Sequence, residues 1–291
     1  MDHVELSSGV TLAVNTFDPV GEPAGRDIVL THGLASNARL WTGAAEHLAA
    51  AGHRVATFDQ RGHGQSSKPD VVDGGAGYEM QIVADDAALL IGAIGFERPI
   101  IGGQSWGGNV VLEAAHRHGD LISGAILVDG GFLHLRRQFP EWDACRAALA
   151  PPPLLGTPLA DIKGWVESMA ADWPADGRAA TLANFEVRDD ATIAPWLTFD
   201  RHIAVLRGLW EHEPSTRYAD IDMPVLVIVA ASTDADRVRK ATAVDEAVEL
   251  LPDGRAVWFQ PAHHDVHAQK PDEVAEAIAA FARGEGQLGR G

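Results

Sequence analysis

The sequence has little that would support a disulfide, a metal centre or a membrane span. Its 291 residues include a single cysteine, Cys145, which excludes an internal disulfide and any CxxC metal site. The 13 histidines show no HExxH or other zinc-ligand spacing, so we expect no metal and no cofactor. The cluster His263-His264-x-x-His267 is the one place where a metal remains an alternative.

The sequence also lacks targeting and membrane signals. No apolar run approaches the roughly 18 residues that a membrane-spanning helix requires. The first residues, Met1-Asp2-His3-Val4-Glu5, do not follow the basic-then-apolar pattern of a signal peptide. These two absences predict a cytoplasmic protein with no membrane partner.

Basic residues are scarce relative to acidic ones. The chain has 23 Lys and Arg against 41 Asp and Glu, which gives a net charge of −18. Such a chain would be repelled by polyanions, so nucleic acid and anionic membranes are not expected as partners. With 46% hydrophobic residues, the composition is that of an ordinary soluble globular protein. A small-molecule substrate with an apolar portion is the expected partner, and the oligomeric state does not follow from the sequence.

What the sequence does contain is a motif around Ser105. Gly103-Gln104-Ser105-Trp106-Gly107 fits the G-x-S-x-G pattern, in which a serine lies on a sharp turn between a strand and a helix. Pro99-Ile100-Ile101 precedes it as a short apolar strand, and residues 109–118 follow with helical spacing. The glycines allow neighbouring backbone to approach a strained serine, whose hydroxyl then lies beside the N-terminus of the helix.

Strands and helices alternate on both sides of a central break. A hairpin is expected at 4–6 and 10–17, and continuous apolar strands typical of a buried parallel sheet at 27–31, 54–58, 99–101, 125–128, 225–230 and 256–260. Helices are expected after Asn37 and at about 78–94, 109–118, 235–250 and 271–282. Between 132 and 218 the pattern shows helical pieces separated by prolines and no clear strand. We predict a core of residues 1–131 and 219–291 and a helical cap of residues 132–218.

In this order of motifs the chain resembles the α/β-hydrolase superfamily over nearly its whole length. The resemblance is carried by His32-Gly33 after one strand, by residues 59–66 (Asp-Gln-Arg-Gly-His-Gly-Gln-Ser) after the next, and by the Ser105 motif. It implies an α/β fold with a mostly parallel, doubly wound sheet flanked by helices. It also implies a serine hydrolase with a Ser–Asp–His triad and an inserted cap.

The resemblance assigns Ser105 as the nucleophile and His264 as its base. Family members carry a Gly-His pair with a proline seven residues after the histidine. Counting back from Pro271 gives His264, with His263 where glycine is usual. His263 stays an alternative base, and we interpret His263 and His267 as residues that pack the loop. The activity of a serine hydroxyl depends on such a base.

Two aspartates compete for the position beside the base. Asp234 lies four residues beyond the strand that ends at Ala230, so that Ser105, Asp234 and His264 follow the family's order. Asp129 is the alternative acid, since some relatives carry it after the strand that follows the serine helix. We predict Asp234, and we interpret Asp236 as a helix-capping or surface residue.

The resemblance further predicts an oxyanion hole formed by the backbone N–H groups of Leu34 and Trp106. The loop at 59–66 is expected to be a structural brace, with Arg61 bound to backbone or to a carboxylate. Five tryptophans in the cap allow two interpretations, an apolar pocket for part of the substrate or a core for the cap itself: Trp142, Trp165, Trp173, Trp196 and Trp210.

The predicted activity is hydrolysis of a carboxylic ester, thioester or lactone through an acyl-enzyme at Ser105. A proline iminopeptidase-like aminopeptidase is an alternative because residues 103–108 resemble that family, but His32-Gly33-Leu34-Ala35-Ser36 departs from its His-Gly-Gly-Pro-Gly loop. A C–C bond hydrolase, a cofactor-free haloperoxidase and a non-catalytic receptor on the same fold stay open. Serine at 105 argues against epoxide hydrolases and haloalkane dehalogenases, which use aspartate there.

Overall fold

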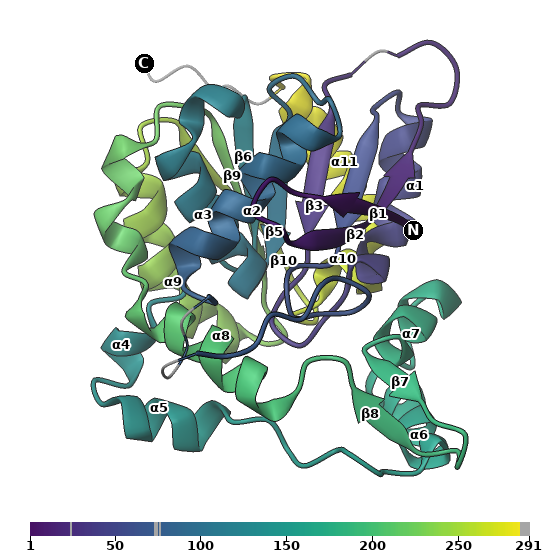
Figure 1. Cartoon of the computed structure of the whole chain (residues 1–291). Helices are drawn as coiled ribbons and strands as arrows, with labels where there is room; N and C mark the ends of the chain where they lie inside the picture. The colour runs from purple at the N-terminus through teal and green to yellow at the C-terminus, as the bar shows by residue number, and fades with distance from the viewer. Residues whose placement is uncertain (24, 73–74, 76, 286–291) are drawn as a thin grey trace.

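The computed structural model describes residues 1–285 except 24, 73, 74 and 76, and a single large sheet organises it (Figure 1). The strands are β1 (Asp2–Glu5), β2 (Thr11–Phe17), β3 (Ile28–Thr31), β4 (Val55–Phe58), β5 (Ile100–Gln104), β6 (Gly124–Val128), β9 (Val225–Ala230) and β10 (Gly254–Phe259). Their order in the sheet is β1-β2-β4-β3-β5-β6-β9-β10. The hairpin β1–β2 joins antiparallel, and the strands from β4 to β10 run parallel.

Burial explains why the central strands read as continuous apolar runs. Every residue of β3, β4, β5, β6 and β9 is buried, because helices cover both faces of the sheet. Since parallel strands end at one edge, the loops after β3, β5, β6 and β9 meet there. Open α/β sheets bind their ligands at this carboxyl edge.

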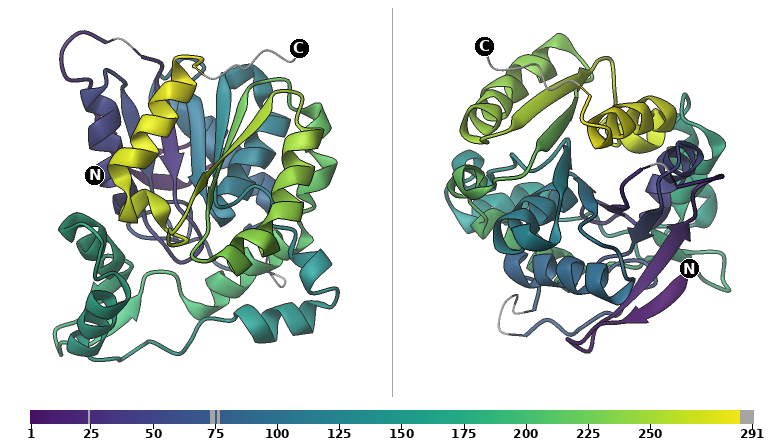
Figure 2. Two further views of the ribbon diagram at one scale, coloured as in Figure 1. Left: turned by 180° about the vertical axis from the view of Figure 1, so that it is seen from behind. Right: turned by 90° about the horizontal axis from the view of Figure 1, so that it is seen from above.

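The helices form two layers (Figure 2). One face of the sheet is covered by α2 (Met80–Ala93), α3 (Trp106–Arg117) and α9 (Asp234–Leu250), whose buried side chains belong to the larger hydrophobic core. The other face is covered by α1 (Thr42–Ala50) and α11 (Pro271–Ala282), which pack in the second core. A 3₁₀ helix (Ala38–Trp41) precedes α1, and the short α10 (Val266–Gln269) precedes α11.

The chain between β6 and β9 contributes no strand to this sheet. It forms the helices α4 (Leu135–Gln138), α5 (Trp142–Leu149), α6 (Leu159–Met169), α7 (Ala175–Leu182) and α8 (Phe199–Glu211), followed by two 3₁₀ turns at Pro214–Thr216 and Tyr218–Asp220. Figure 1 shows α4 to α8 gathered at one end of the sheet.

One expectation for this segment is wrong, because it contains two strands. β7 (Phe185–Val187) and β8 (Ile193–Pro195) pair as an antiparallel hairpin. Asp190 shapes its turn by accepting the backbone N–H of Thr192 at 3.1 Å, and Ile193 is buried. Three residues per strand are too few to show the alternation by which a strand is read from sequence.

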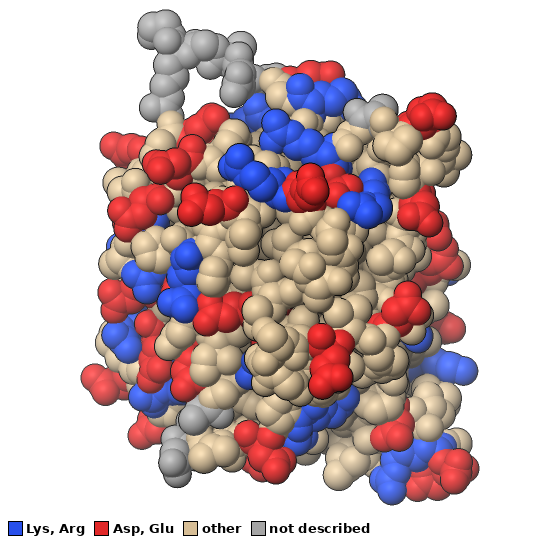
Figure 3. Space-filling model, turned by 45° about the horizontal axis from the view of Figure 1, so that its top comes forward, with Lys and Arg blue, Asp and Glu red and all other residues tan. Residues whose placement is uncertain are grey.

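The predicted fold is otherwise confirmed, an α/β fold with a mostly parallel, doubly wound sheet. β9 and α11 have the predicted bounds, and α2, α3, α9 and β10 differ from the expected ranges by a few residues. Within the part of the chain that the structure describes, no helix combines the length and apolarity that a membrane crossing requires. Figure 3 shows acidic and basic side chains interspersed on one face.

Candidate active site

Ser105 lies on the sharp turn between β5 and α3. Its backbone has φ 54° and ψ −121°, a conformation that is strained for a residue with a side chain. The turn is held by hydrogen bonds from the Ser105 N–H to the carbonyl of Val128 (2.8 Å) and from the Gly108 N–H to the Ser105 carbonyl (2.9 Å). A Cβ on Gly103 would lie 2.2 Å from the carbonyl oxygen of Gly107. A Cβ on Gly107 would lie 2.4 Å from the carbonyl oxygen of His32, so small residues are required on both sides of the serine.

His264 is held by Asp129. Nδ1 of His264 lies 2.6 Å from Oδ2 of Asp129, whose side chain is only 1% exposed, whereas the imidazole is 46% exposed. Asp129 directly follows β6 and has a positive φ of 42°. Its Oδ1 also accepts the backbone N–H of Ala230 at 3.2 Å. Since Nδ1–H donates to the carboxylate, Nε2 is the ring nitrogen left to act as a base.

The prediction that Asp234 lies beside His264 is wrong in this structure. Asp234 is the first residue of α9, and its exposed carboxylate accepts the side-chain N–H of Gln260 at 2.6 Å. Thr233 caps the helix by accepting the Asp236 N–H, and Asp236 accepts the Ser232 N–H at 3.1 Å. The capping interpretation of Asp236 therefore holds. A carboxylate in the first turn of a helix suits the helix dipole, which explains Asp234 without a catalytic role.

The electrostatics of His264 combine opposing effects. Burial opposes its charged form, whereas the hydrogen bond to Asp129 and the charges of Asp265 and Asp129 favour it, and the pKa of His264 is raised above its usual value. Lys240 acts in the opposite direction. The net effect is an imidazole that is more basic than a free histidine side chain.

The neighbouring histidines are occupied elsewhere. His263 accepts the Asp265 N–H at 3.1 Å and lies edge-on to Trp173. His267 is fully buried against Trp41, and burial lowers its pKa to about 3. The three rings of the His263-His264-x-x-His267 cluster therefore serve different partners. Over the described ranges, no group of three or more His, Cys, Asp or Glu side chains is arranged to hold a metal ion.

Ser105 and His264 border one small cavity of about 160 Å³. Gly33, Leu34 and Asp265 also line it, as do Thr181 and Asn184 from the segment between β6 and β9: the complete lining is Gly33, Leu34, Ala35, Ser36, Leu40, Gln104, Ser105, Thr181, Asn184, His264 and Asp265. No hydrogen bond joins Ser105 and His264 in the described chain. Such contacts are often long in unliganded enzymes and shorten when substrate binds.

The two predicted oxyanion donors lie at this cavity or next to it. Leu34 lines the cavity, and a Cβ on the preceding Gly33 would lie 3.1 Å from Cβ of Ser105. Trp106 is the first residue of α3, so its N–H has no partner within the helix. The oxyanion hole of Leu34 and Trp106 stays a prediction that agrees with these positions.

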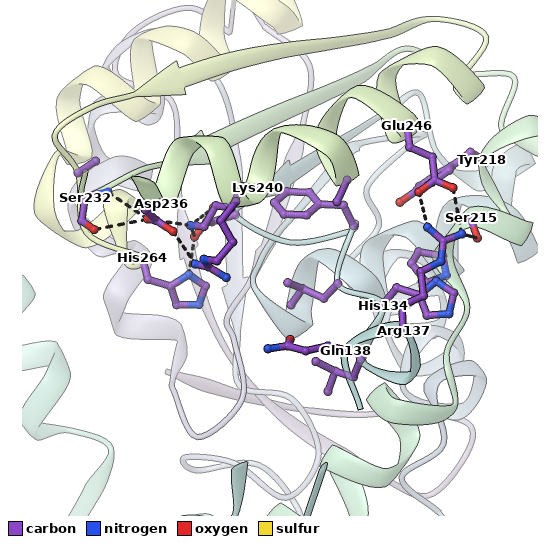
Figure 4. A pocket seen from close by; sticks show the side chains of 18 of the residues that line it. His134, Arg137, Gln138, Ser215, Tyr218, Ser232, Asp236, Lys240, Glu246 and His264 are labelled. Atoms are coloured by element: carbon purple, nitrogen blue, oxygen red, sulfur yellow. Dashed lines mark hydrogen bonds and ion pairs between the residues drawn. The ribbon is translucent and has the colours of Figure 1, made fainter. Parts of the chain in front are cut away.

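His264 also borders a second, larger cavity of about 690 Å³ (Figure 4). Its walls come from the loop after β6, from α4, from α9 and from the loop that carries His264, and they combine charged side chains such as Glu246 with apolar ones such as Phe132. Asp129 and Lys240 line it as well. His264 therefore borders both a small cavity that Ser105 also lines and a larger one with a mixed polar and apolar lining.

Comparison with known proteins identifies the family of this chain. The family model described as alpha/beta hydrolase fold matches residues 28–271. The chain belongs to the α/β-hydrolase family. It is 27% identical to epoxide hydrolase A of Mycobacterium tuberculosis, over 91% of this chain and 92% of that protein. It is 25% identical to the 2-(acetamidomethylene)succinate hydrolase of Mesorhizobium japonicum, over 96% of both chains. A solved structure of E-2-(acetamidomethylene)succinate hydrolase superimposes with a TM-score of 0.78 at 24% identity, covering 96% of this chain and 97% of that one.

In this hydrolase the loop at 59–66 is a brace, as predicted. Arg61 donates to both oxygens of buried Asp86, at 2.5 and 2.7 Å, and to the carbonyl of Gly77. Asp59 accepts the N–H groups of Ala38 and Gln65, both at 2.8 Å. These contacts tie the loop after β4 to the loop that carries Leu34.

The tryptophans between β6 and β9 pack within that segment or against its neighbours. Trp142 and Trp210 lie with ring centroids 5.7 Å apart, Trp173 is buried, and Trp165 is 52% exposed. Trp196 lies under the ammonium group of Lys68. Over the described residues, no tryptophan lines either cavity bordered by His264. The cap-core interpretation of the tryptophans fits these contacts better than an aromatic substrate pocket.

Two residues of the site were not anticipated from the sequence. The side chain of Gln104 donates to the carbonyl of His264 at 3.2 Å, and Lys240 contacts both oxygens of Asp129. Gln104 carried a usable signal, because it directly precedes the serine. Lys240 carried none, since a lysine on a polar helix is ordinarily exposed.

Proposed function

We propose that this α/β-hydrolase is a serine hydrolase that cleaves a carboxylic ester, thioester or lactone through an acyl-enzyme at Ser105. The observation that carries the proposal is the common cavity of Ser105 and His264, with the imidazole bound through Nδ1 to buried Asp129. The proposed triad is Ser105, His264 and Asp129, with Asp129 in place of Asp234.

The proposed reaction has two steps. Nε2 of His264 takes the proton of the Ser105 hydroxyl as Oγ attacks the substrate carbonyl, and the N–H groups of Leu34 and Trp106 stabilise the oxyanion. The tetrahedral intermediate expels the alcohol or thiol, which receives the proton from His264. Water then attacks the acyl-enzyme with the same base, and the acid is released with Ser105 restored.

We also propose that residues 132–218 act as a cap over this site. Thr181 and Asn184 border the small cavity, and Asn37 of the core donates to the carbonyl of Ala180 (2.8 Å) and to Oδ1 of Asn184 (2.5 Å). A segment fastened to the core at the serine is suited to select substrates. The apolar portion expected of the substrate remains a prediction: Phe132 and Tyr218 line the larger cavity, whereas over the described residues no Phe, Tyr or Trp lines the small cavity of Ser105.

One of the two relatives argues against its own chemistry in this chain, and the other agrees with the proposal. An epoxide hydrolase is expected to carry aspartate at position 105, so Ser105 argues against that chemistry despite the 27% identity. A hydrolase of 2-(acetamidomethylene)succinate among the relatives agrees with hydrolysis of a small acyl compound.

The test is labelling with a fluorophosphonate, followed by assays of p-nitrophenyl esters. The wild-type chain is expected to be labelled at Ser105, and Ser105→Ala is expected to lose labelling and about four to six orders of magnitude in turnover. Esters should be cleaved faster than proline anilides. An active Ser105→Ala variant would refute the covalent mechanism, and faster turnover of the proline substrate would favour the aminopeptidase alternative.

A further inference from the structure

Lys240 occupies an unusual position for a lysine, beside the acid of the site. Its ammonium group lies 3.0 Å from Oδ1 and 2.7 Å from Oδ2 of Asp129, and 2.7 Å from the carbonyl oxygen of Ala230. The side chain is only 13% exposed. An ammonium group has three N–H donors, and these three acceptors use all of them. Figure 4 shows Lys240 next to Asp236 and His264 at the wall of the larger cavity.

The position of this ammonium group is fixed by the fold. Lys240 lies on α9, and Ala230 is the last residue of β9, so the lysine joins the helix to the carboxyl edge of the sheet. Asp129 meanwhile accepts from Ala230 N–H and lies against His264. Rotation of the carboxylate would break contacts with Lys240, with Ala230 and with the imidazole.

We propose that Lys240 is a positioning residue that holds the Asp129 carboxylate against His264 and moderates the negative charge that the imidazole faces. The inference rests on the proposed function in one respect, that His264 is the base. Lys240 touches neither Ser105 nor the small cavity, and it acts through Asp129.

The charges around His264 determine the sign of the effect. Asp129 lies at the end of β6, and α9 contributes Lys240, Asp236 and Arg239. The loop of His264 itself contributes Asp265, His263 and His267, and His32 acts on His267 in turn. Asp129 and Asp265 raise the pKa of His264, and Lys240 lowers it. Removal of the lysine charge therefore stabilises the imidazolium, so that the base is freed only at a higher pH.

Titration of His264 by NMR tests the inference without any turnover. Histidine labelled at Cε1 is followed from pH 5 to 9, and the signal of His264 is assigned by its loss in His264→Gln. In Lys240→Gln, which removes the charge but keeps N–H donors for Asp129, we expect the pKa of His264 to rise by about one unit, in line with the loss of a nearby like charge. Lys240→Arg keeps the charge and is expected to stay near the wild-type value.

Arg239→Met is the matched control. Arg239 is the next residue on α9, has the same charge and lines the same cavity, but it is 69% exposed and contacts Asp236 rather than Asp129. It should leave the titration of His264 unchanged. Lys240→Met removes the N–H donors as well as the charge, so that Asp129 is no longer held against His264, and a smaller rise than in Lys240→Gln is expected.

An unchanged or lowered pKa of His264 in folded Lys240→Gln would overturn the inference, as would an equal rise in Arg239→Met. In an active enzyme, the acidic limb of kcat/KM should move to higher pH by the same amount. A wild-type chain without labelling at Ser105 refutes the proposed function but leaves the titration intact. If the wild-type chain is labelled normally but the pKa of His264 does not change in Lys240→Gln, only the proposed role of Lys240 is refuted.

Discussion

The side-chain amide of Gln104 donates to the carbonyl oxygen of His264 at 3.2 Å. This contact joins the residue before the proposed nucleophile to the residue proposed as its base, and Gln104 is almost fully buried. A Cβ on Gly33 would lie 2.4 Å from Oε1 of Gln104, so the same side chain also fills the space beneath the Leu34 loop. Gln104 thus joins the turn of Ser105, the loop of His264 and the loop of Leu34.

Gln104→Leu is expected to lower kcat by about 3- to 10-fold with little change in KM. The substitution removes one hydrogen bond, worth about 0.5–1.5 kcal/mol, that orients the His264 loop. Steady-state kinetics on p-nitrophenyl acetate measures the effect. Gln65→Leu on the exposed side of the brace loop is the control and should leave kcat unaltered. Equal rates for wild type and Gln104→Leu would show that the loop is oriented by other contacts.

Asp129→Asn is expected to lower kcat by about 10⁴, and Asp234→Asn by less than about 2-fold. Asparagine at 129 no longer favours the tautomer of His264 that exposes Nε2 as an acceptor, nor does it stabilise the imidazolium. In the part of the chain that the structure describes, the carboxylate of Asp234 is bound only to Gln260, on the surface. Thermal unfolding of both variants separates lost folding from lost chemistry. A folded, active Asp129→Asn together with an inactive Asp234→Asn would return the acid to the later loop.

The sheet and two members of the proposed triad could be predicted from the sequence because their signals are local. The serine motif lies within five consecutive residues, and His264 was found by its spacing from Pro271. The acid could not be predicted, since Asp129 and Asp234 both follow parallel strands that end at one edge of the sheet. Which of the two aspartates reaches His264 depends on the path of the chain after β9. Ala231 donates to the carbonyl of Phe259, and Thr233 then caps α9. Asp234 therefore begins a helix on the surface.

Gly130→Ala is expected to destabilise the fold by about 1–3 kcal/mol and to reduce Ser105 labelling. A Cβ at Gly130 would lie 2.0 Å from the carbonyl oxygen of Ser105 and 2.8 Å from its Cα, so the strained turn must shift. Urea unfolding and labelling rates measure the two effects. Gly92→Ala in α2 is the matched control, because no atom outside its own helix lies within 4 Å of the new Cβ. It should stabilise the fold by about 0.5–1 kcal/mol.

If Gly130→Ala is as stable as wild type and is labelled at the same rate, the turn at Ser105 is not confined by the loop after β6. A loss of stability without a loss of labelling would mean that the loop after β6 moves and the serine does not. The two measurements therefore locate the strain on one side of the contact or the other.

His267 makes the fold sensitive to acid. The ring is fully buried against Trp41 and neither nitrogen has a hydrogen-bond partner in the described chain. Burial lowers its pKa from 6.5 to about 3, with smaller effects of His264, His32 and His263. Since the folded-state pKa is depressed, the unfolded chain takes up a proton that the folded chain refuses. The contribution of His267 to the free energy of unfolding is therefore complete above about pH 6.5, and it is lost as the pH falls from 6.5 towards 3.

His267→Phe keeps a flat ring on Trp41 and removes this titration. Each pH unit between the two pKa values costs about 1.4 kcal/mol, so about 2 kcal/mol of the stability lost by wild type between pH 6.5 and 5 should be retained in the variant. Urea unfolding at the two pH values measures the difference, and His3→Gln on the exposed first strand is the control that should follow wild type. The same loss of stability in His267→Phe and wild type would mean that His267 is protonated in the folded chain or reached by water.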